Sequence, residues 1–279
     1  MGPSYFDYLQ GMLKERSGLV VTPEKVYLLE TRLLPVAHRH GYKNIDELVD
    51  ALKTRHDESI SVDITEAMNT HESLFFRDNS PFDLFQKTIL PQLLKRRADT
   101  KSFRIWCAAC SSGQEPYSLA MTLEGEASKL QGWRTEIIAT DISHSVLDRA
   151  AQGLYSQFEV QRGLPVQMLV KHFTREDEYW RLNTDIRDKV HFRHLNLLED
   201  MRGLGTFDIV FCRNVLIYFD VETKGAVLDG VSTVLKPDGV LFLGSAESTI
   251  GITDKFWPVK AGRGVYKHID GSASIAEEE

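Results

Sequence analysis

The first hundred residues place apolar side chains at helical spacing. Segment 5–18, YFDYLQGMLKERSG, repeats apolar positions three and four residues apart and stops at Gly18. Thr22 and Pro23 then supply an N-cap and a first helical position, and this second helix must end or kink near Pro35. Further helices are predicted over residues 44–55, 60–71 and 80–98. Since no strand-like alternation interrupts these segments, we expect an all-α N-terminal unit.

From Phe103 onward, short apolar runs alternate with helical patterns. Strands are predicted over residues 103–109, 135–140, 190–197, 207–214 and 239–247, with a final edge strand over residues 264–268. Between them, helices are predicted over residues 116–130, 145–155 and, with a closing turn, 222–239. This alternation predicts right-handed βαβ units and an α/β fold with a doubly wound, parallel-dominated sheet. The alternation lapses between about Phe158 and Val190, where we expect a small inserted antiparallel element.

The hexapeptide IWCAAC at residues 105–110 has the C-x-x-C spacing of a redox dithiol. In a thioredoxin the helix follows the cysteines at once, whereas here the stretch 111–115 intervenes and helix signals begin at Pro116. Cys107 would then lie inside a buried strand, where a thiol ionises poorly. We therefore favour a packed strand end followed by a loop over a redox site.

The loop after this strand has small residues that let a ligand approach the backbone. Ala109, Ser111 and Gly113 stand in place of a G-x-G-x-x-G run, and the P-loop lysine is also missing. Asp141 ends the next predicted strand, where its carboxylate either takes both hydroxyls of a ribose or caps the following helix. An adenosine-type cofactor without a phosphate grip indicates S-adenosylmethionine as much as NAD.

Two further features favour S-adenosylmethionine, and a third bears on the substrate. Residues 235–244, LKPDGVLFLG, read as a helix end, a tight turn and a strand, as in many class I methyltransferases. The extra domain is helical and comes first, whereas a dehydrogenase of this length needs a substrate domain after its nucleotide fold. Amino-methyltransferases of nucleic acids usually carry [DNS]-P-P-[YFW] after the fourth strand. This chain has CRNVLIYF at residues 212–219, so base methylation is disfavoured.

Composition narrows the setting. The 279 residues are 42% hydrophobic and carry a formal net charge of -7, which argues against a dominant nucleic-acid surface. The chain has no apolar run that could span a bilayer and no secretory signal pattern, so we expect a cytoplasmic protein without membrane insertion. The dense basic run 95–97 is expected to be the solvated end of a helix. No H-E-x-x-H or paired C-x-x-C spacing occurs, so no metal is expected.

Six motifs are specific in combination and extend over nearly the whole chain. They are FFRD (75–78), CSSGQEPYSLAM (110–121), ATDIS (139–143), NLL (196–198), FDIVFCRNVLIYFD (207–220) and LKPDGVLFLGSAES (235–248). With these motifs the sequence resembles the chemotaxis receptor methyltransferases, the CheR family. The resemblance implies a small helical domain joined to a Rossmann-like catalytic domain with a three-stranded β-subdomain. It also implies methyl transfer from S-adenosylmethionine to glutamate side chains on the cytoplasmic helices of chemoreceptors, with S-adenosylhomocysteine as product, for sensory adaptation.

The resemblance also divides the chain. It implies a receptor-recognition domain over residues 1–70, a linker and connecting helix over 71–101, and the methyltransferase domain over 102–269. The β-subdomain is expected at about residues 156–190, and the tail 270–279 is expected to be disordered.

The family motifs assign site residues by position. The implied cofactor contacts are His71, Ser73, Arg77, Ala109, Glu115, Asp141, Asn196, Leu197, Arg213 and Asn214, and the residues implied to face the acceptor glutamate are Arg77 and Tyr218. The chain departs from the family pattern at three positions. It has His71 for an asparagine, Ala109 for a glycine, and Gln114 for the first of two glutamates.

The chemistry requires no general base. A glutamate carboxylate is already ionised at neutral pH, so it can attack a sulfonium methyl directly. Arg77 is expected to orient that carboxylate and Tyr218 to donate a hydrogen bond to it. The plainer alternatives are a salt bridge for Arg77 and core packing for Tyr218. Glu115 suits the cofactor's ammonium, or simply the positive end of a helix.

Receptor recognition has its own pattern. Lys25, Arg32 and Arg39 are spaced by seven and would form a basic stripe matching heptad-spaced receptor glutamates, although an ordinary solvated face is the alternative. Segment 173–182, FTREDEYWRL, is short and lacks the glycines of relatives that dock a receptor pentapeptide, so we expect no use of that tether. We expect a monomer recruited to chemoreceptor arrays. The rival functions are a small-molecule methyltransferase and a non-catalytic scaffold.

Overall fold

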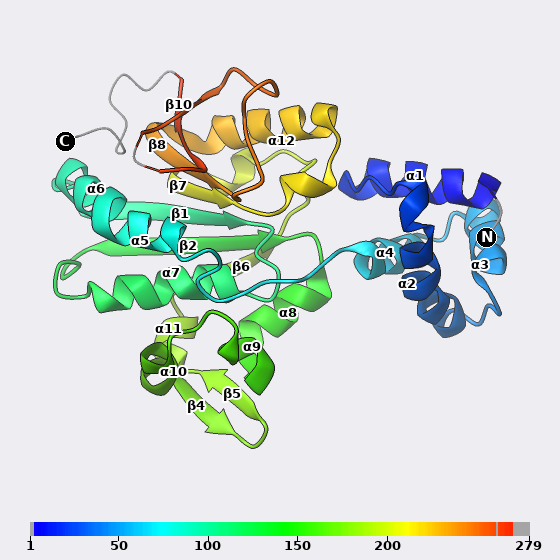
Figure 1. Cartoon of the computed structure of the whole chain (residues 1–279), viewed down its shortest axis with the longest axis horizontal. Helices are drawn as coiled ribbons and strands as arrows, with labels where there is room; N and C mark the ends of the chain where they lie inside the picture. Colours follow the sequence, from blue (N-terminus) through cyan, green and yellow to red (C-terminus); the bar gives the residue numbers. More distant parts are fainter. Residues whose placement is uncertain (1–2, 261, 270–279) are drawn as a thin grey trace. The chain divides into compact units, whose positions relative to one another are not determined.

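A computed structural model describes residues 3–260 and 262–269, so the tail expected to be disordered lies outside the described residues. The chain divides into two compact units (Figure 1). The helical unit holds residues up to Thr70 together with Tyr218–Thr223, and the second unit holds the rest. Over the described ranges, no helix is long and apolar enough to cross a membrane.

The helical unit is built from four α-helices and one short turn. They are α1 (Pro3–Ser17), η1 (Pro23–Lys25), α2 (Val26–Arg39), α3 (Ile45–Arg55) and α4 (Glu58–Met68). Leucine side chains spaced by three and four residues, such as Leu29 and Leu33 of α2, form a fully buried core. Pro35 lies inside α2, which continues to Arg39, so the proline does not end this helix. The segment 218–223 joins this unit through a hydrogen bond from the Val20 N–H to the Tyr218 carbonyl (3.0 Å).

The helix predicted over residues 80–98 is interrupted. It consists of α5 (Ser80–Leu84), a π-helical turn η2 (Phe85–Ile89) and α6 (Leu90–Arg96). Pro91 has no N–H to donate to the carbonyl four residues earlier, and its ring crowds that carbonyl. The Leu90 N–H instead donates to the Phe85 carbonyl, five residues back, which widens the turn.

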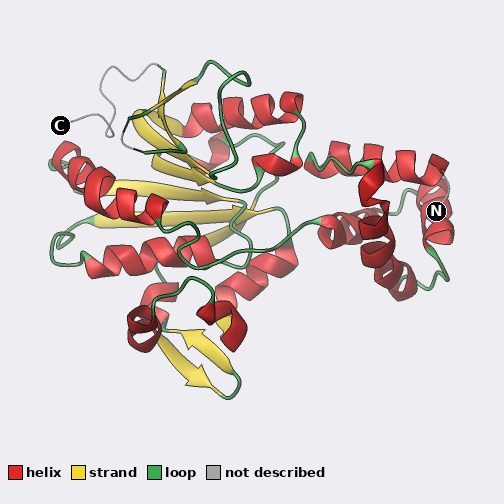
Figure 2. Ribbon diagram, in the orientation of Figure 1, coloured by secondary structure: helices red, strands yellow, loops and turns green. Residues whose placement is uncertain are grey.

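The second unit contains the seven-stranded sheet, with helices on both sides (Figure 2). Its order is β6 (Val190–His194), β2 (Arg134–Asp141), β1 (Ser102–Ala108), β7 (Phe207–Cys212), β8 (Leu235–Leu243), β10 (Val265–His268), β9 (Phe256–Pro258). The first five strands are parallel, β10 runs antiparallel to β8, and β9 pairs antiparallel with β10. The helices between them are α7 (Gln114–Gly125), α8 (His144–Gln152) and α12 (Val221–Val234), with short turns η3 (Arg202–Leu204) and η4 (Leu216–Tyr218). The predicted α/β fold with a parallel-dominated sheet is confirmed.

The inserted antiparallel element is confirmed as a three-stranded sheet of order β3-β5-β4. Its elements are β3 (Leu154–Ser156), α9 (Gln157–Gln161), α10 (Val166–His172), β4 (Phe173–Glu176), β5 (Tyr179–Leu182) and α11 (Thr184–Arg187). The prediction that the preceding helix extends to Tyr155 is wrong. Gly153 adopts a left-handed conformation (φ 61°) that ends α8, and the chain continues as a strand.

The basic run 95–97 at the end of α6 is not simply solvated. The Arg97 Nε donates to Oδ1 of Asp208 (2.7 Å), a fully buried carboxylate near the start of β7. Lys236 Nζ and the Arg104 N–H bind the same carboxylate (2.8 and 2.9 Å). Because a buried charge must be paired, these contacts fasten α6 to the start of the sheet.

Candidate active site

Four parallel strands deliver their loops to one edge of the large sheet. β1, β2, β6 and β7 are all parallel, so their carboxyl ends lie at the same edge, as the arrowheads of β1 and β2 indicate (Figure 1). From β1 the chain moves outward to β2 and β6, and it then returns to β7 on the other side of β1. The loops after β1 and β7 therefore diverge at a topological switch point, where α/β sheets bind their ligands.

The loop after β1 turns sharply three times. Ala109, Ser111 and Gly113 have φ values of 53°, 52° and 93°, so every second residue is left-handed. A Cβ on Gly113 would lie 3.0 Å from the Tyr117 ring, so this position requires glycine for both space and conformation. Tyr155 of the small sheet donates its hydroxyl to the Ser112 carbonyl (2.7 Å) and braces this loop from outside.

Asp141 connects the loops after β1 and β2. Its Oδ2 accepts from the Ser111 N–H (2.9 Å) and its Oδ1 from the Ser143 N–H (3.1 Å). The helix-cap alternative for Asp141 is wrong, because the Ser143 side chain accepts from the Val146 N–H and caps α8. Burial raises the pKa of Asp141, and the two amides oppose that rise. Each carboxylate oxygen keeps a lone pair that can accept from a ribose hydroxyl.

Glu115, Arg213 and Asp78 form a chain of charges at the start of α7. The Arg213 guanidinium donates to Oε2 of Glu115 (2.9 Å) and to Oδ2 of Asp78 (2.7 Å). Burial raises the pKa of Glu115, and the positive charge of Arg213 opposes that rise. The Arg213 side chain is 1% exposed, yet within the described part of the chain its Nε has no hydrogen-bond partner. A buried guanidinium with a spare donor fits a carboxylate ligand.

These residues fit S-adenosylmethionine. Its ribose hydroxyls match Asp141, its ammonium matches Glu115, and its carboxylate matches the unpartnered donor of Arg213. The left-handed loop places small residues and backbone amides beside them. The chemistry of these three groups therefore suits that cofactor.

Segment 71–78, which carries the FFRD motif, is anchored within the second unit. Phe75 is fully buried and packs edge-on against Tyr155 (4.9 Å between ring centroids). The Phe76 N–H donates to Ser118 Oγ of α7 (2.9 Å), and Ser111 Oγ donates to the His71 carbonyl (3.0 Å). The segment is thereby tied to both the cofactor loop and the small sheet.

Arg77 and Ser73 both belong to this anchored segment. Both are half-buried. Among the described residues, Arg77 makes one side-chain hydrogen bond, from Nη1 to the Glu72 carbonyl (3.4 Å), and no ion pair. The salt-bridge alternative for Arg77 is therefore not what the structure has.

The loops after β6 and β7 complete this edge. The Leu195 N–H donates to the Asp141 carbonyl (3.1 Å), which places the Asn196–Leu197 turn beside the end of β2. Leu197 is buried, and Asn196 Oδ1 accepts from the Leu198 N–H. Asn214 has a left-handed φ of 60° directly after Arg213.

Glu247, at the same edge of the sheet, is not predicted from the sequence as a site residue. Glu247 is buried beyond the end of β8 and accepts from the Asn214 N–H (2.7 Å). The motif containing it was recognised, but a single glutamate within a loop gave no signal of its contacts.

The cysteines are packed in the interior, as predicted for Cys107. Cys107, Cys110 and Cys212 are free thiols and all are buried. Burial raises the pKa of each thiol well above its usual value. The C-x-x-C spacing therefore marks a strand end and not a redox pair.

The remaining site residues lie in the helical unit. Tyr218 is half-buried in η4 and belongs to this unit, whereas Arg77 belongs to the other. Arg32 donates to the Met68 and Asn69 carbonyls (2.7 and 3.1 Å) and so holds the end of α4. Arg39 is exposed and lies 3.5 Å from Asp63 of α4, and Lys25 is exposed at the start of the helix.

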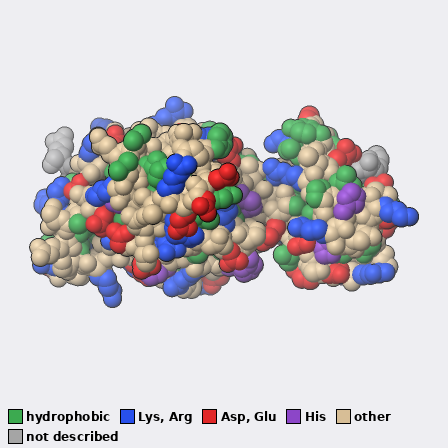
Figure 3. All heavy atoms as spheres, turned by 90° about the horizontal axis from the view of Figure 1, so that it is seen from below, with side chains coloured by type: hydrophobic (Ala, Val, Ile, Leu, Met, Phe, Trp, Pro, Cys, Tyr) green, Lys and Arg blue, Asp and Glu red, His purple; other side chains and the backbone are tan. Residues whose placement is uncertain are grey.

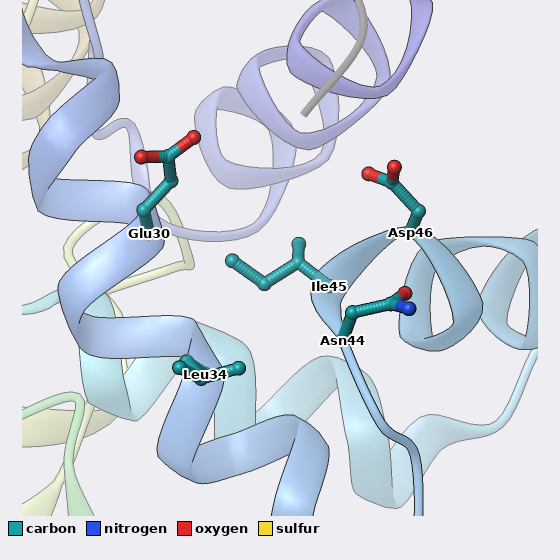
Figure 4. A pocket seen from close by; sticks show the side chains of 5 residues that line it. All are labelled: Glu30, Leu34, Asn44, Ile45 and Asp46. Carbon is teal, nitrogen blue, oxygen red and sulfur yellow. The ribbon is translucent and has the colours of Figure 1, made fainter.

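A cleft of about 190 Å³ lies between α2 and the start of α3. Figure 4 shows Glu30 and Leu34 of α2 facing Asn44, Ile45 and Asp46 at the start of α3. Its two carboxylates make it unlike the basic stripe, and it contains none of the predicted site residues. Acidic and basic side chains are also interspersed over the face drawn in Figure 3.

Fold and site together define a class I S-adenosylmethionine-dependent methyltransferase. The model of the CheR methyltransferase S-adenosylmethionine-binding domain matches residues 71–265, and that of the CheR all-alpha domain matches residues 4–61. The chain therefore belongs to the CheR methyltransferase family.

Curated relatives extend over most of the chain. Chemotaxis protein methyltransferase 1 of Pseudomonas aeruginosa is 39% identical, over 93% of this chain and 96% of the relative. Chemotaxis protein methyltransferase Cher2 of Pseudomonas putida is 36% identical, over 93% and 96%. Chemotaxis protein methyltransferase 1 of Vibrio cholerae is 38% identical, over 94% of each chain.

Proposed function

We propose that this chain transfers the methyl group of S-adenosylmethionine to glutamate side chains of chemoreceptors, for sensory adaptation. The products are glutamate methyl esters and S-adenosylhomocysteine. The observation that carries the proposal is the family match in both parts of the chain, all-alpha and cofactor-binding. A small-molecule substrate, for which the helical domain would serve as a pocket lid, is less favoured, because the match to chemotaxis methyltransferases extends over both parts of the chain.

The cofactor site is assigned residue by residue. Asp141 accepts from the ribose hydroxyls, Glu115 binds the ammonium, and Arg213 donates to the carboxylate. The other proposed contacts are His71, Ser73, Arg77, Ala109, Asn196, Leu197 and Asn214. When bound, S-adenosylmethionine supplies an electrophilic methyl group on a sulfonium. The hydrogen bonds of Asp141 and the bracing of the loop by Tyr155 hold the site in shape.

The acceptor glutamate needs orientation more than activation. We propose that Arg77 steers the incoming carboxylate and that the Tyr218 hydroxyl donates to the same oxygen. The half-buried guanidinium of Arg77, without an ion-pair partner among the described residues, supports this role. Holding an ionised oxygen in line with the methyl group supplies roughly 7–11 kcal/mol in favourable cases.

We propose that residues 1–70 recognise the receptor's cytoplasmic helical bundle and that residues 102–269 carry out methyl transfer. Residues 71–101 form the linker and connecting helix between these two domains. Of the basic stripe, Lys25 and Arg39 are exposed, Arg39 with an ion pair to Asp63, whereas Arg32 holds α4. Arg39→Glu should therefore weaken receptor methylation several-fold without changing S-adenosylhomocysteine affinity. Lys43→Glu, at an exposed position before α3, is the matched control and should change neither. Equal losses in the two variants would rule out the stripe.

We also propose that the protein works as a cytoplasmic monomer at receptor arrays without the pentapeptide tether. The β4–β5 hairpin turns through Asp177 (φ 53°) and has no glycine, which supports this view. Calorimetric titration with a receptor-tail pentapeptide should show no binding at micromolar concentrations. Micromolar binding would contradict the proposal.

Labelled S-adenosylmethionine with receptor-containing membranes tests the function. The expected result is label on the receptor that is released by mild base, as an ester is. Receptors whose methylation-site glutamates are changed to alanine serve as the control and should stay unlabelled. Label on a soluble small molecule, or no transfer by protein that binds the cofactor, would refute the assignment.

A further inference from the structure

Glu247 collects backbone donors from two loops at the active-site edge. Its Oε2 accepts from the Asn214 N–H (2.7 Å) and the Gly244 N–H (2.6 Å). Its Oε1 accepts from the Ile217 N–H (3.3 Å). The residue is 8% exposed, so these three amides replace the water that the carboxylate would otherwise bind.

The surrounding residues leave room for this carboxylate. A Cβ on Gly244 would lie 2.7 Å from Glu247 Oε2 and 2.8 Å from Asn214 Nδ2, so a side chain there would displace both. Asn214 is held in a left-handed conformation (φ 60°), which asparagine tolerates better than most residues other than glycine. Glu247 accepts from the N–H of this residue directly and so holds the turn in place.

The bonds made by Glu247 bracket the loop that follows β7. Arg213, with its spare buried donor, precedes one bonded amide, and Tyr218 follows the other at Ile217. Glu247 itself makes no hydrogen bond or ion pair with either of these two described side chains. We propose that Glu247 is a positioning residue for methyl transfer, which sets the Arg213–Asn214 turn through Oε2 and the start of η4 through Oε1. The expected effect on kcat rests on the proposed function, whereas the expected effect on S-adenosylhomocysteine affinity rests on cofactor binding alone.

The two oxygens predict a split between variants. In Glu247→Gln the remaining carbonyl can still accept from Asn214 and Gly244, but the amide group meets the Ile217 N–H with a donor. This variant should keep S-adenosylhomocysteine affinity within about threefold of wild type, while kcat falls about tenfold or more. Glu247→Ala loses all three bonds, so its affinity should also fall about tenfold or more.

The test combines calorimetry with S-adenosylhomocysteine, receptor-methylation kinetics and thermal unfolding. Asp208→Asn is the matched control, since Asp208 is a buried carboxylate that binds a backbone N–H and side-chain cations at the opposite end of β7. It should lower Tm but leave affinity and kcat near wild type.

If both Glu247 variants lower Tm only, as the control does, the residue is structural and the inference fails. If Glu247→Ala does not fold, the kcat-against-affinity split of Glu247→Gln still decides. Wild-type protein that binds S-adenosylhomocysteine but labels no receptor would refute the proposed function and leave the affinity test of Glu247→Ala intact.

Discussion

Removing one hydroxyl from Tyr155 should separate loop bracing from stability. Tyr155 is fully buried, and its hydroxyl donates to the carbonyl of Ser112, itself 2% exposed, at 2.7 Å. Tyr155→Phe keeps the ring packed on Phe75 but leaves this carbonyl without its donor, which costs about 1–3 kcal/mol. The corresponding drop in Tm is about 2–5 °C at this chain length. Because the loop at residues 109–113 loses its outer brace, we expect S-adenosylhomocysteine to bind about five- to tenfold more weakly, the larger factor corresponding to about 1.4 kcal/mol.

Tyr117 provides the matched control for this experiment. Its hydroxyl is also buried and donates at the same distance (2.7 Å), but to the Ala150 carbonyl in α8 and not to the cofactor loop. Because the Ala150 carbonyl still accepts from the Gly153 N–H (3.0 Å), Tyr117→Phe should lose less stability than Tyr155→Phe in a thermal melt and keep its affinity in calorimetry. Equal losses of affinity in the two variants would show that bracing of Ser112 by Tyr155 is irrelevant to cofactor binding.

Two further predictions concern the cofactor site. Ala109→Gly should raise the free energy of unfolding in urea by about 0.5 kcal/mol, since relief of the left-handed strain exceeds the added entropy of the unfolded chain; a loss above about 1 kcal/mol would contradict this. The pKa values of Asp141 and Glu115 are raised in the folded protein, so burial of these carboxylates opposes folding above those pKa values and the penalty vanishes as pH falls through them. Calorimetry with S-adenosylhomocysteine should show the opposite trend, because the ligand needs the ionised carboxylates. As pH falls, the affinity should begin to drop at a higher pH than the titration of an ordinary carboxylate would give. If the affinity instead stays unchanged until the pH reaches the ordinary carboxylate range, the role of these groups is refuted.

The large sheet was predictable because parallel strands are buried on both faces. Continuous apolar runs therefore mark β1, β2 and β7, and the helices between them keep their own spacing. β3 was missed because the helix before it ends at a left-handed glycine, Gly153, which periodicity does not reveal. β9 was missed because it has three residues and ends in Pro258, too short for a pattern.

The candidate site was predictable where a residue's role follows from its place on one element. Asp141 ends a strand and Glu115 starts a helix, and both positions are visible in the sequence. The contacts of Glu247 and Tyr155 join loops 33 and 43 residues apart, so only the folded chain brings them together. Arg32 was assigned to the receptor from its spacing, yet its guanidinium holds the end of α4, a contact 36 residues away.

The central claim is that the loop beginning at Ala109 and the carboxylate of Asp141 form the adenosyl site. Calorimetry of the purified protein with S-adenosylhomocysteine tests it most directly, with Asp141→Ala as the variant and Asp177→Ala, on the exposed β4–β5 turn, as the control. Two charged hydrogen bonds of about 1.5–3 kcal/mol each predict a loss of affinity of about a hundredfold or more in Asp141→Ala. The control should bind like wild type. Failure of the wild-type protein to bind, or undiminished binding by Asp141→Ala, would contradict the account.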